Sequence, residues 1–460
     1  MCVREEQYKE SGSMVFMPIG ETASSYKAGT PVLDVCLLVG FLLEAIIAKS
    51  QFNGLIGGWR GHMILTVVML ALLLVRGVWI RIREPFCFAP PHPIGTLLAI
   101  ACVWAAICCI LQPNAYANLV FLTVFAANIY VCLYIAPNLV LPYLGERSVL
   151  LYALPLFAVN VLNLFVGTGA APQGSTNWRL AGITDNATHS GALAALGSIL
   201  ALWMLVSWPQ RRRMWFFFWG VSMLTLALSR TRSSIIGCAL GSTFLLIEWC
   251  RRRPRHHLTK LTIGLVFSAV AIMTIVLYRP HLINELGVFF RASGGVETIL
   301  QSRMSLWQDG VTSVRHRPLF GSGPMAKFDD TNDPTINTYN EKSICGNSLL
   351  LFAQSYGVPG ALLFALLLIE IVRIAMKMRG KLRLLLLGVI LMGVGASISQ
   401  MWAVSFGAPS DRAVWLILGV ALARNRNSDK NCSMRLRHDF RIQAEPVNRM
   451  LADQWTVQQS

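Results

Sequence analysis

The chain alternates long apolar runs with short polar segments. An α-helix needs roughly 20 mostly apolar residues to cross the hydrocarbon core of a bilayer. Hydrophobic residues make up 54% of the chain and charged residues only 14%, whereas about 25% charged is usual in soluble domains. We therefore predict an all-α, polytopic integral membrane protein. Its twelve expected spans are residues 31–48, 62–80, 93–111, 117–136, 148–166, 187–207, 214–228, 233–249, 258–278, 347–372, 382–404 and 412–423.

The positions of Lys and Arg predict the orientation of these spans. The formal net charge is +17, and the basic residues gather in short runs at 211–213, 251–255 and 373–383 and in the tail from Arg424. With twelve spans, all of these runs fall on one side of the membrane. Loops rich in Lys and Arg are typically cytoplasmic, so we expect both termini inside. This pattern belongs to membrane topology, and we expect no nucleic-acid partner.

Four regions follow from this topology. Residues 1–30 form a polar cytoplasmic segment unlike a cleaved signal, and 31–166 hold the first five spans. Residues 167–423 hold the other spans and a long outer loop at 279–343, and 424–460 form a cytoplasmic tail. The loop has apolar residues at helical spacing, which predicts an amphipathic helix on the membrane surface. These residues are Ile299, Met304, Trp307 and Val311.

Neither a metal nor a cofactor is expected. The chain has 11 cysteines, most of them inside apolar runs, where they behave as small hydrophobes. Neither a C-x-x-C spacing nor paired Cys and His ligands occur.

Several arginines are expected on the outer face, where water meets hydrocarbon. Arg179 lies in the outer loop before the sixth span, Arg230 and Arg232 in the turn between the seventh and eighth, and Arg303 in the long loop. Such a residue costs up to about 3 kcal/mol on insertion scales, and a phosphate ligand would offset that cost because guanidinium binds it bidentately. The alternative for any one of them is a topology anchor that snorkels to the interface, the interpretation we give Arg412.

Short motifs occur in a fixed order along the second half of the chain. They are Arg179-Leu-Ala-Gly182 with Thr184-Asp-Asn186, Ser229-Arg230-Thr231-Arg232-Ser233-Ser234-Ile-Ile-Gly237, Ser302-Arg303-Met-Ser-Leu-Trp307, Arg317-Pro318-Leu-Phe-Gly321-Ser-Gly323, Gly346-Asn347-Ser348, and Tyr356-Gly357-Val-Pro-Gly360. In this order the set resembles the O-antigen ligase and polymerase superfamily of bacterial envelope polysaccharide enzymes. The resemblance covers roughly residues 179–371, and the earlier spans match only in hydropathy.

The resemblance implies a C-class membrane glycosyltransferase in the bacterial inner membrane, with its active site facing the periplasm. Its donor would be a glycan on polyprenyl diphosphate, its acceptor a glycan or a lipid-linked sugar, and its partners the bilayer and possible chain-length regulator and flippase proteins. Neither a nucleotide sugar nor a metal would be needed. By the motif match, Arg179 and Arg232 would hold the diphosphate, with Arg230 as the alternative and Arg303 as a third candidate. The substrate-binding candidates also include Asn186, Asn347 and Ser348.

One position departs from the family pattern. Ligases of this superfamily usually carry His before the Asn-Ser pair, where this chain has Gly346. Glycine cannot accept a proton, so the general base would be His189, Glu341 or a loop carboxylate, namely Asp329, Asp330 or Asp333. The missing His favours polymerisation of repeat units over ligation to a lipid A core. A polysaccharide or lipid transporter remains the second alternative, although mid-depth charges and similar halves are lacking.

Three acids lie within predicted spans. Glu370 is three residues before Arg373, which predicts a local ion pair. Asp34 and Glu44 are near opposite ends of one span, and we interpret them as membrane-boundary residues.

Overall fold

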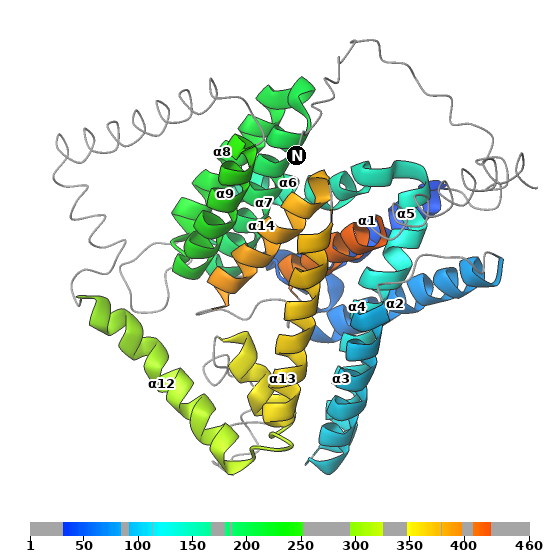
Figure 1. Ribbon diagram of the computed structural model, residues 1–460, viewed down its shortest axis with the longest axis vertical. Helices are drawn as coiled ribbons and strands as arrows, with labels where there is room; N and C mark the ends of the chain where they lie inside the picture. The colour runs from blue at the N-terminus through cyan, green and yellow to red at the C-terminus, as the bar shows by residue number, and fades with distance from the viewer. Residues whose placement is uncertain are drawn as a thin grey trace, which may run out of the picture.

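The computed structural model describes residues 31–83, 92–112, 114–166, 180–184, 186–251, 295–324, 347–378, 380–397 and 408–424. This part of the chain is helical (Figure 1), and an isolated antiparallel bridge joins Ser50 and Thr184. The all-α prediction is confirmed for these residues.

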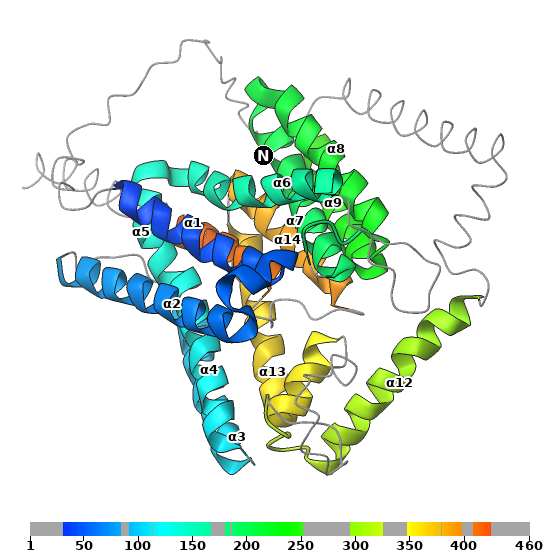
Figure 2. The same ribbon diagram turned by 180° about the vertical axis from the view of Figure 1, so that it is seen from behind.

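The first half of the chain forms the helices α1 to α6. Figure 2 shows α1 and α2 side by side on the rear of the molecule. The bounds are α1 Pro31–Ala48, η2 Gln51–Ile56, α2 Gly58–Arg83, α3 His92–Leu111, α4 Ala115–Tyr130, η3 Val131–Ile135, α5 Ala136–Leu144, η4 Gly145–Arg147 and α6 Ser148–Val166.

The helix from α4 to α5 differs from the prediction. The expected span ended at residue 136, but the helical path continues to Leu144 through one π-helical turn, η3. Pro137 stands at the start of α5 and has no N–H to donate to the preceding turn. A wider π turn accommodates that missing hydrogen bond and lets the helix go on.

The second half contains the central helices. The bounds are α7 Ala187–Ser207, η5 Pro209–Arg211, α8 Arg212–Ser229, α9 Arg232–Arg251, α12 Gly295–His316, α13 Ser348–Lys377 and α14 Lys381–Ala396, and a last helix covers residues 409–424. The ninth predicted span, 258–278, and the end of the eleventh lie outside the described residues.

Helix α7 is the core of the fold. In its most apolar stretch 83% of the residues are buried, against 17% for α2. It packs on α6, α8, α9 and α14, which surround it in Figure 1. Any functional group at an end of α7 is therefore held by several helices at once.

Helices α9 and α14 approach each other through glycines. A methyl group on Gly241 would lie 2.6 Å from the carbonyl oxygen of Gly388, and one on Gly237 would clash with the carbonyl of Met392. The two α9 glycines are spaced as in a small-x-x-x-small motif, which lets helix backbones meet closely in a membrane. The beginning of α9 is thus fixed against α7 on one side and α14 on the other.

The outer surfaces of many helices are apolar. Exposed large side chains occur along α2, α3, α8 and α13, for example Ile64, Val103, Phe216 and Ile369. Six helices of the described part are long and apolar enough to cross a membrane. Such surfaces suit lipid contact and mark a multi-pass membrane protein. The count of twelve spans and the outer position of the loop stay predictions.

Candidate active site

The turn between α8 and α9 carries two of the predicted arginines. Arg230 adopts a left-handed backbone conformation, with φ of 53°, and ends α8, while Arg232 begins α9. Between them, the Thr231 hydroxyl donates to the carbonyl oxygen of Ala187 over 3.0 Å. Both arginines are partly buried. The turn is therefore fastened to the first residue of α7.

The start of α7 is shaped to receive this turn. A methyl group on Gly191 would lie 2.5 Å from the Thr231 hydroxyl oxygen and 2.8 Å from that of Ser229. Asn186 precedes the helix and its side-chain oxygen accepts from the Thr188 N–H over 2.8 Å. Asn186, predicted to contact substrate, thus has a structural role as the N-cap of α7.

His189 lies in the first turn of α7 and is half-buried. Of the general-base candidates, His189 is the one within the described residues. Glu341, Asp329, Asp330 and Asp333 lie outside them.

Residues 180–184 join this region to the N-terminal helices, a link that sequence reasoning missed. The Gln51 N–H donates to the Ile183 carbonyl over 2.9 Å, and the Gln51 side chain donates to the Gly182 carbonyl over 3.0 Å. On the other side, the Leu180 N–H donates to the Leu228 carbonyl over 3.0 Å, two residues before Arg230. Arg179 precedes Leu180 in the chain and lies outside the described residues.

Two of the sequence motifs interlock in the structure. The backbone N–H groups of Ser322 and Gly323 donate to the carbonyls of Gln354 and Ser355 over 2.7 and 3.0 Å. In return, the Val358 N–H donates to the Pro318 carbonyl over 2.8 Å. Helix α13, which covers most of the expected span 347–372, bends sharply at Gly357, whose φ is 72°. An exposed loop motif and a helix motif therefore form one unit.

The remaining motif residues are placed as follows. Asn347 caps α13, its side-chain oxygen accepting from the Leu350 N–H over 3.1 Å, and Ser348 is buried behind it. The helix predicted in the long loop is α12. Met304 and Val311, expected on its apolar side, are 51% and 40% exposed in the described structure. Arg303 lies on α12, and the structure describes the helix there but not this side chain.

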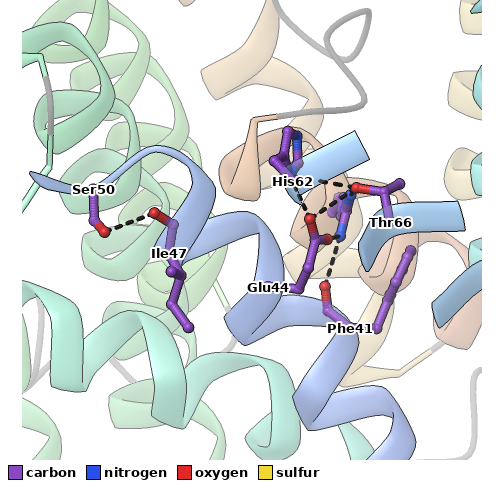
Figure 3. Close-up of polar contacts among 7 residues, drawn as sticks. Phe41, Glu44, Ile47, Ser50, His62 and Thr66 are labelled. Carbon is purple, nitrogen blue, oxygen red and sulfur yellow. Dashed lines mark hydrogen bonds and ion pairs between the residues drawn. The ribbon is translucent and has the colours of Figure 1, made fainter. Parts of the chain in front are cut away.

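A second polar cluster, outside the predicted site, corrects two interpretations (Figure 3). Glu44 is buried, with the His62 Nδ1 2.5 Å from its Oε1 and the Thr66 hydroxyl donating over 2.8 Å. Arg412 is 1% exposed and donates to the other oxygen of Glu44 and, over 2.7 Å, to the Phe41 carbonyl. Arg412 is therefore no snorkelling anchor, and Glu44 is no boundary residue.

Asp34 was also interpreted wrongly. It is 1% exposed and receives two hydrogen bonds from Arg76, over 2.6 and 3.0 Å. The physical reason is the same for both acids. A buried charge needs a partner, and here each partner comes from another helix, which spacing within one span cannot indicate. The local pair of Glu370 and Arg373 is confirmed, at 2.7 and 2.8 Å.

Comparison with known proteins places the central part of the chain in a family. Residues 217–365 match the family model described as O-antigen ligase. This match supports the resemblance of the segment to the O-antigen ligase and polymerase superfamily. The matched segment holds Arg230, Arg232, Arg303, Asn347 and Ser348, whereas Arg179 and His189 precede it. No curated protein matches the chain. For this segment, the match supports a membrane glycosyltransferase of ligase or polymerase type.

Proposed function

We propose that the protein works at the periplasmic face of the inner membrane and polymerises polyprenyl-diphosphate-linked oligosaccharide repeat units into O-antigen, capsule or exopolysaccharide. The observation that carries this proposal is the fastening of the Arg230 to Arg232 turn to the start of α7 by the Thr231 hydrogen bond. The turn lies within the segment that matches the O-antigen ligase family. Its two guanidinium groups are two residues apart, a spacing at which like charges repel unless an anion binds between them.

The reaction would proceed by direct transfer. A general base takes the proton of an acceptor hydroxyl, and that oxygen bonds to the anomeric carbon of the donor sugar. The bond from this carbon to the diphosphate oxygen breaks, and its electron pair leaves with the polyprenyl diphosphate. Arg232 and Arg179 would stabilise the charge on the leaving group, and each such donor is worth about 3 to 4 kcal/mol. These guanidiniums would supply the positive charge that a metal ion provides in other glycosyltransferases, so no metal is required. The lipid-linked donor takes the place of a nucleotide sugar.

His189 is the general base that the geometry favours. It lies two residues after Ala187, whose carbonyl binds the turn that leads to Arg232 at the start of α9. A base at the start of α7 and an anion clamp at the start of α9 can flank a single sugar–phosphate bond. Glu341 and the loop aspartates remain alternatives. The partners would be flippase proteins, which supply the repeat units, and chain-length regulator proteins, which set the number of units in each chain.

Ligation of a finished glycan to lipid A core is the second candidate, which the description of the matched family model favours. The glycans of a strain that lacks the gene distinguish the two reactions. Single repeat units on the lipid carrier or on the core support polymerisation. Full-length chains left on the carrier would support ligation and contradict our first assignment. Unchanged glycans of all kinds would contradict both.

A further inference from the structure

A cavity of about 440 Å³ lies where the end of α3 meets the loop after α12. Its walls include Leu111, the last residue of α3, Gln112 directly after it, and residues 317–321 from the loop motif. Figure 1 shows α3, α12 and α13 converging at one end of the molecule, and the contacts of α13 with both other helices agree. None of the residues of the α7 to α9 site lines this cavity.

Arg317 is held in place at the edge of the cavity. Its Nη1 donates to the Gln112 side-chain oxygen over 2.6 Å, and the Gln112 nitrogen donates to the Gly321 carbonyl over 2.5 Å. Gln112 is 9% exposed, so it is fixed at both ends and cannot turn away. In the described part of the chain, the Arg317 side chain forms no other hydrogen bond or ion pair. Since guanidinium has five N–H donors in one plane, most of them remain available for an anion.

The surroundings favour an anion that carries a lipid. Residues 310–324, which include Arg317, contain no acid. Two apolar side chains border the same opening, Leu111 and Leu319, which are 58% and 59% exposed. Basic pockets between membrane helices bind the phosphates of lipid head groups, with apolar neighbours against the hydrocarbon. A free inorganic anion would make no use of the leucines.

We propose that this cavity is a second lipid-diphosphate site, which holds the acceptor. The inference rests on the proposed function, because in polymerisation the donor and the acceptor are both linked to polyprenyl diphosphate. Arg317 would bind the acceptor diphosphate with its outward-facing donors while Leu111 and Leu319 contact the first prenyl units. The donor diphosphate would occupy the separate site at Arg232.

Calorimetric titration of the full-length protein in detergent with farnesyl diphosphate tests this. We expect two binding events in the wild type. Arg317→Gln should weaken one of them about tenfold or more, as expected for a lost charge-assisted contact, and Arg232→Gln should weaken the other. Arg315→Gln is the matched control, since it removes the same charge two residues away, and should change either affinity by less than about twofold. Arg317→Lys keeps the charge without the fork and should lie between.

The outcomes separate the two proposals. One event that is lost in Arg232→Gln and intact in Arg317→Gln would overturn the acceptor site and leave the proposed function standing. One event lost only in Arg317→Gln would support the cavity and contradict the donor site. Equal affinity of the cavity for inorganic pyrophosphate would also overturn the inference, since the apolar rim would then contribute nothing. Thermal melting of each variant shows whether a loss of binding reflects unfolding. Arg317 is exposed at the surface, so we expect its variants to fold.

Discussion

At the residue scale, Glu44 and Arg412 form an ion pair inside the protein, in which each side chain is only 1% exposed. Arg412→Ala would leave the Glu44 carboxylate buried without its cation, which costs about 3 to 5 kcal/mol. We expect a clear fall in the melting temperature of the detergent-solubilised protein. Arg373→Ala is the control, because that arginine forms a pair with Glu370 that solvent screens, so its loss should change the melting temperature little. Equal melting temperatures in both variants would contradict the buried pair.

The same two pairs show what the sequence could predict about single residues. Glu370 and Arg373 are three apart on one helix, so their contact follows from helical spacing alone. Glu44 and Arg412 are 368 residues apart in the chain. Only the packing of α1, α2 and the last helix brings the two residues together, and no local sequence pattern indicates this contact. The N-cap roles of Asn186 and Asn347 could have been foreseen, because Asn186 directly precedes a predicted span and Asn347 is the first residue of another.

At the element scale, the bend of α13 depends on Gly357. Its φ of 72° is a conformation that residues with a side chain rarely adopt, and a methyl group there would collide with the Leu319 carbonyl. We expect Gly357→Ala to destabilise the protein by about 2 kcal/mol or more through strain and the clash. Circular dichroism melting is the measurement.

Gly220→Ala is the matched control for this change. Gly220 lies within α8 and a methyl group there would meet nothing within 4 Å. Alanine in a helix interior is favoured over glycine by up to about 1 kcal/mol, so this variant should melt at the same or a higher temperature. A Gly357→Ala protein as stable as Gly220→Ala would show that the bend does not need glycine.

Helix ends were more predictable than helix shapes. The expected spans 31–48, 148–166 and 187–207 coincide with α1, α6 and α7, because apolar runs there stop at polar residues. The path through η3 into α5 and the bend in α13 were missed, since both segments are apolar throughout and hydropathy does not register a change of helix geometry. The docking of residues 180–184 onto Gln51 was also missed, because backbone hydrogen bonds between loops leave no pattern of side chains.

At the scale of the whole molecule, several helix ends are tied into one face. The end of α1 contacts residues 180–184, which in turn contact the end of α8. Reporter fusions that end at Gly54 and at Arg230 should therefore report the same side of the membrane. The distribution of basic residues predicts that this side is the periplasm, and a fusion at Arg211 should then report the cytoplasm. Opposite sides for Gly54 and Arg230 would contradict the fold, and the same side for Arg230 and Arg211 would contradict the topology.

Turnover by the purified enzyme with a lipid-diphosphate oligosaccharide measures whether Arg232 stabilises the departing diphosphate. Arg232→Ala and Arg179→Ala should each lower the rate of polymer formation about 100-fold or more, as expected when a donor to a developing anion is removed. Arg251→Ala is the control, because Arg251 is exposed at the opposite end of the same helix, and it should retain the wild-type rate. Normal rates of product formation in Arg232→Ala and Arg179→Ala would contradict the assignment.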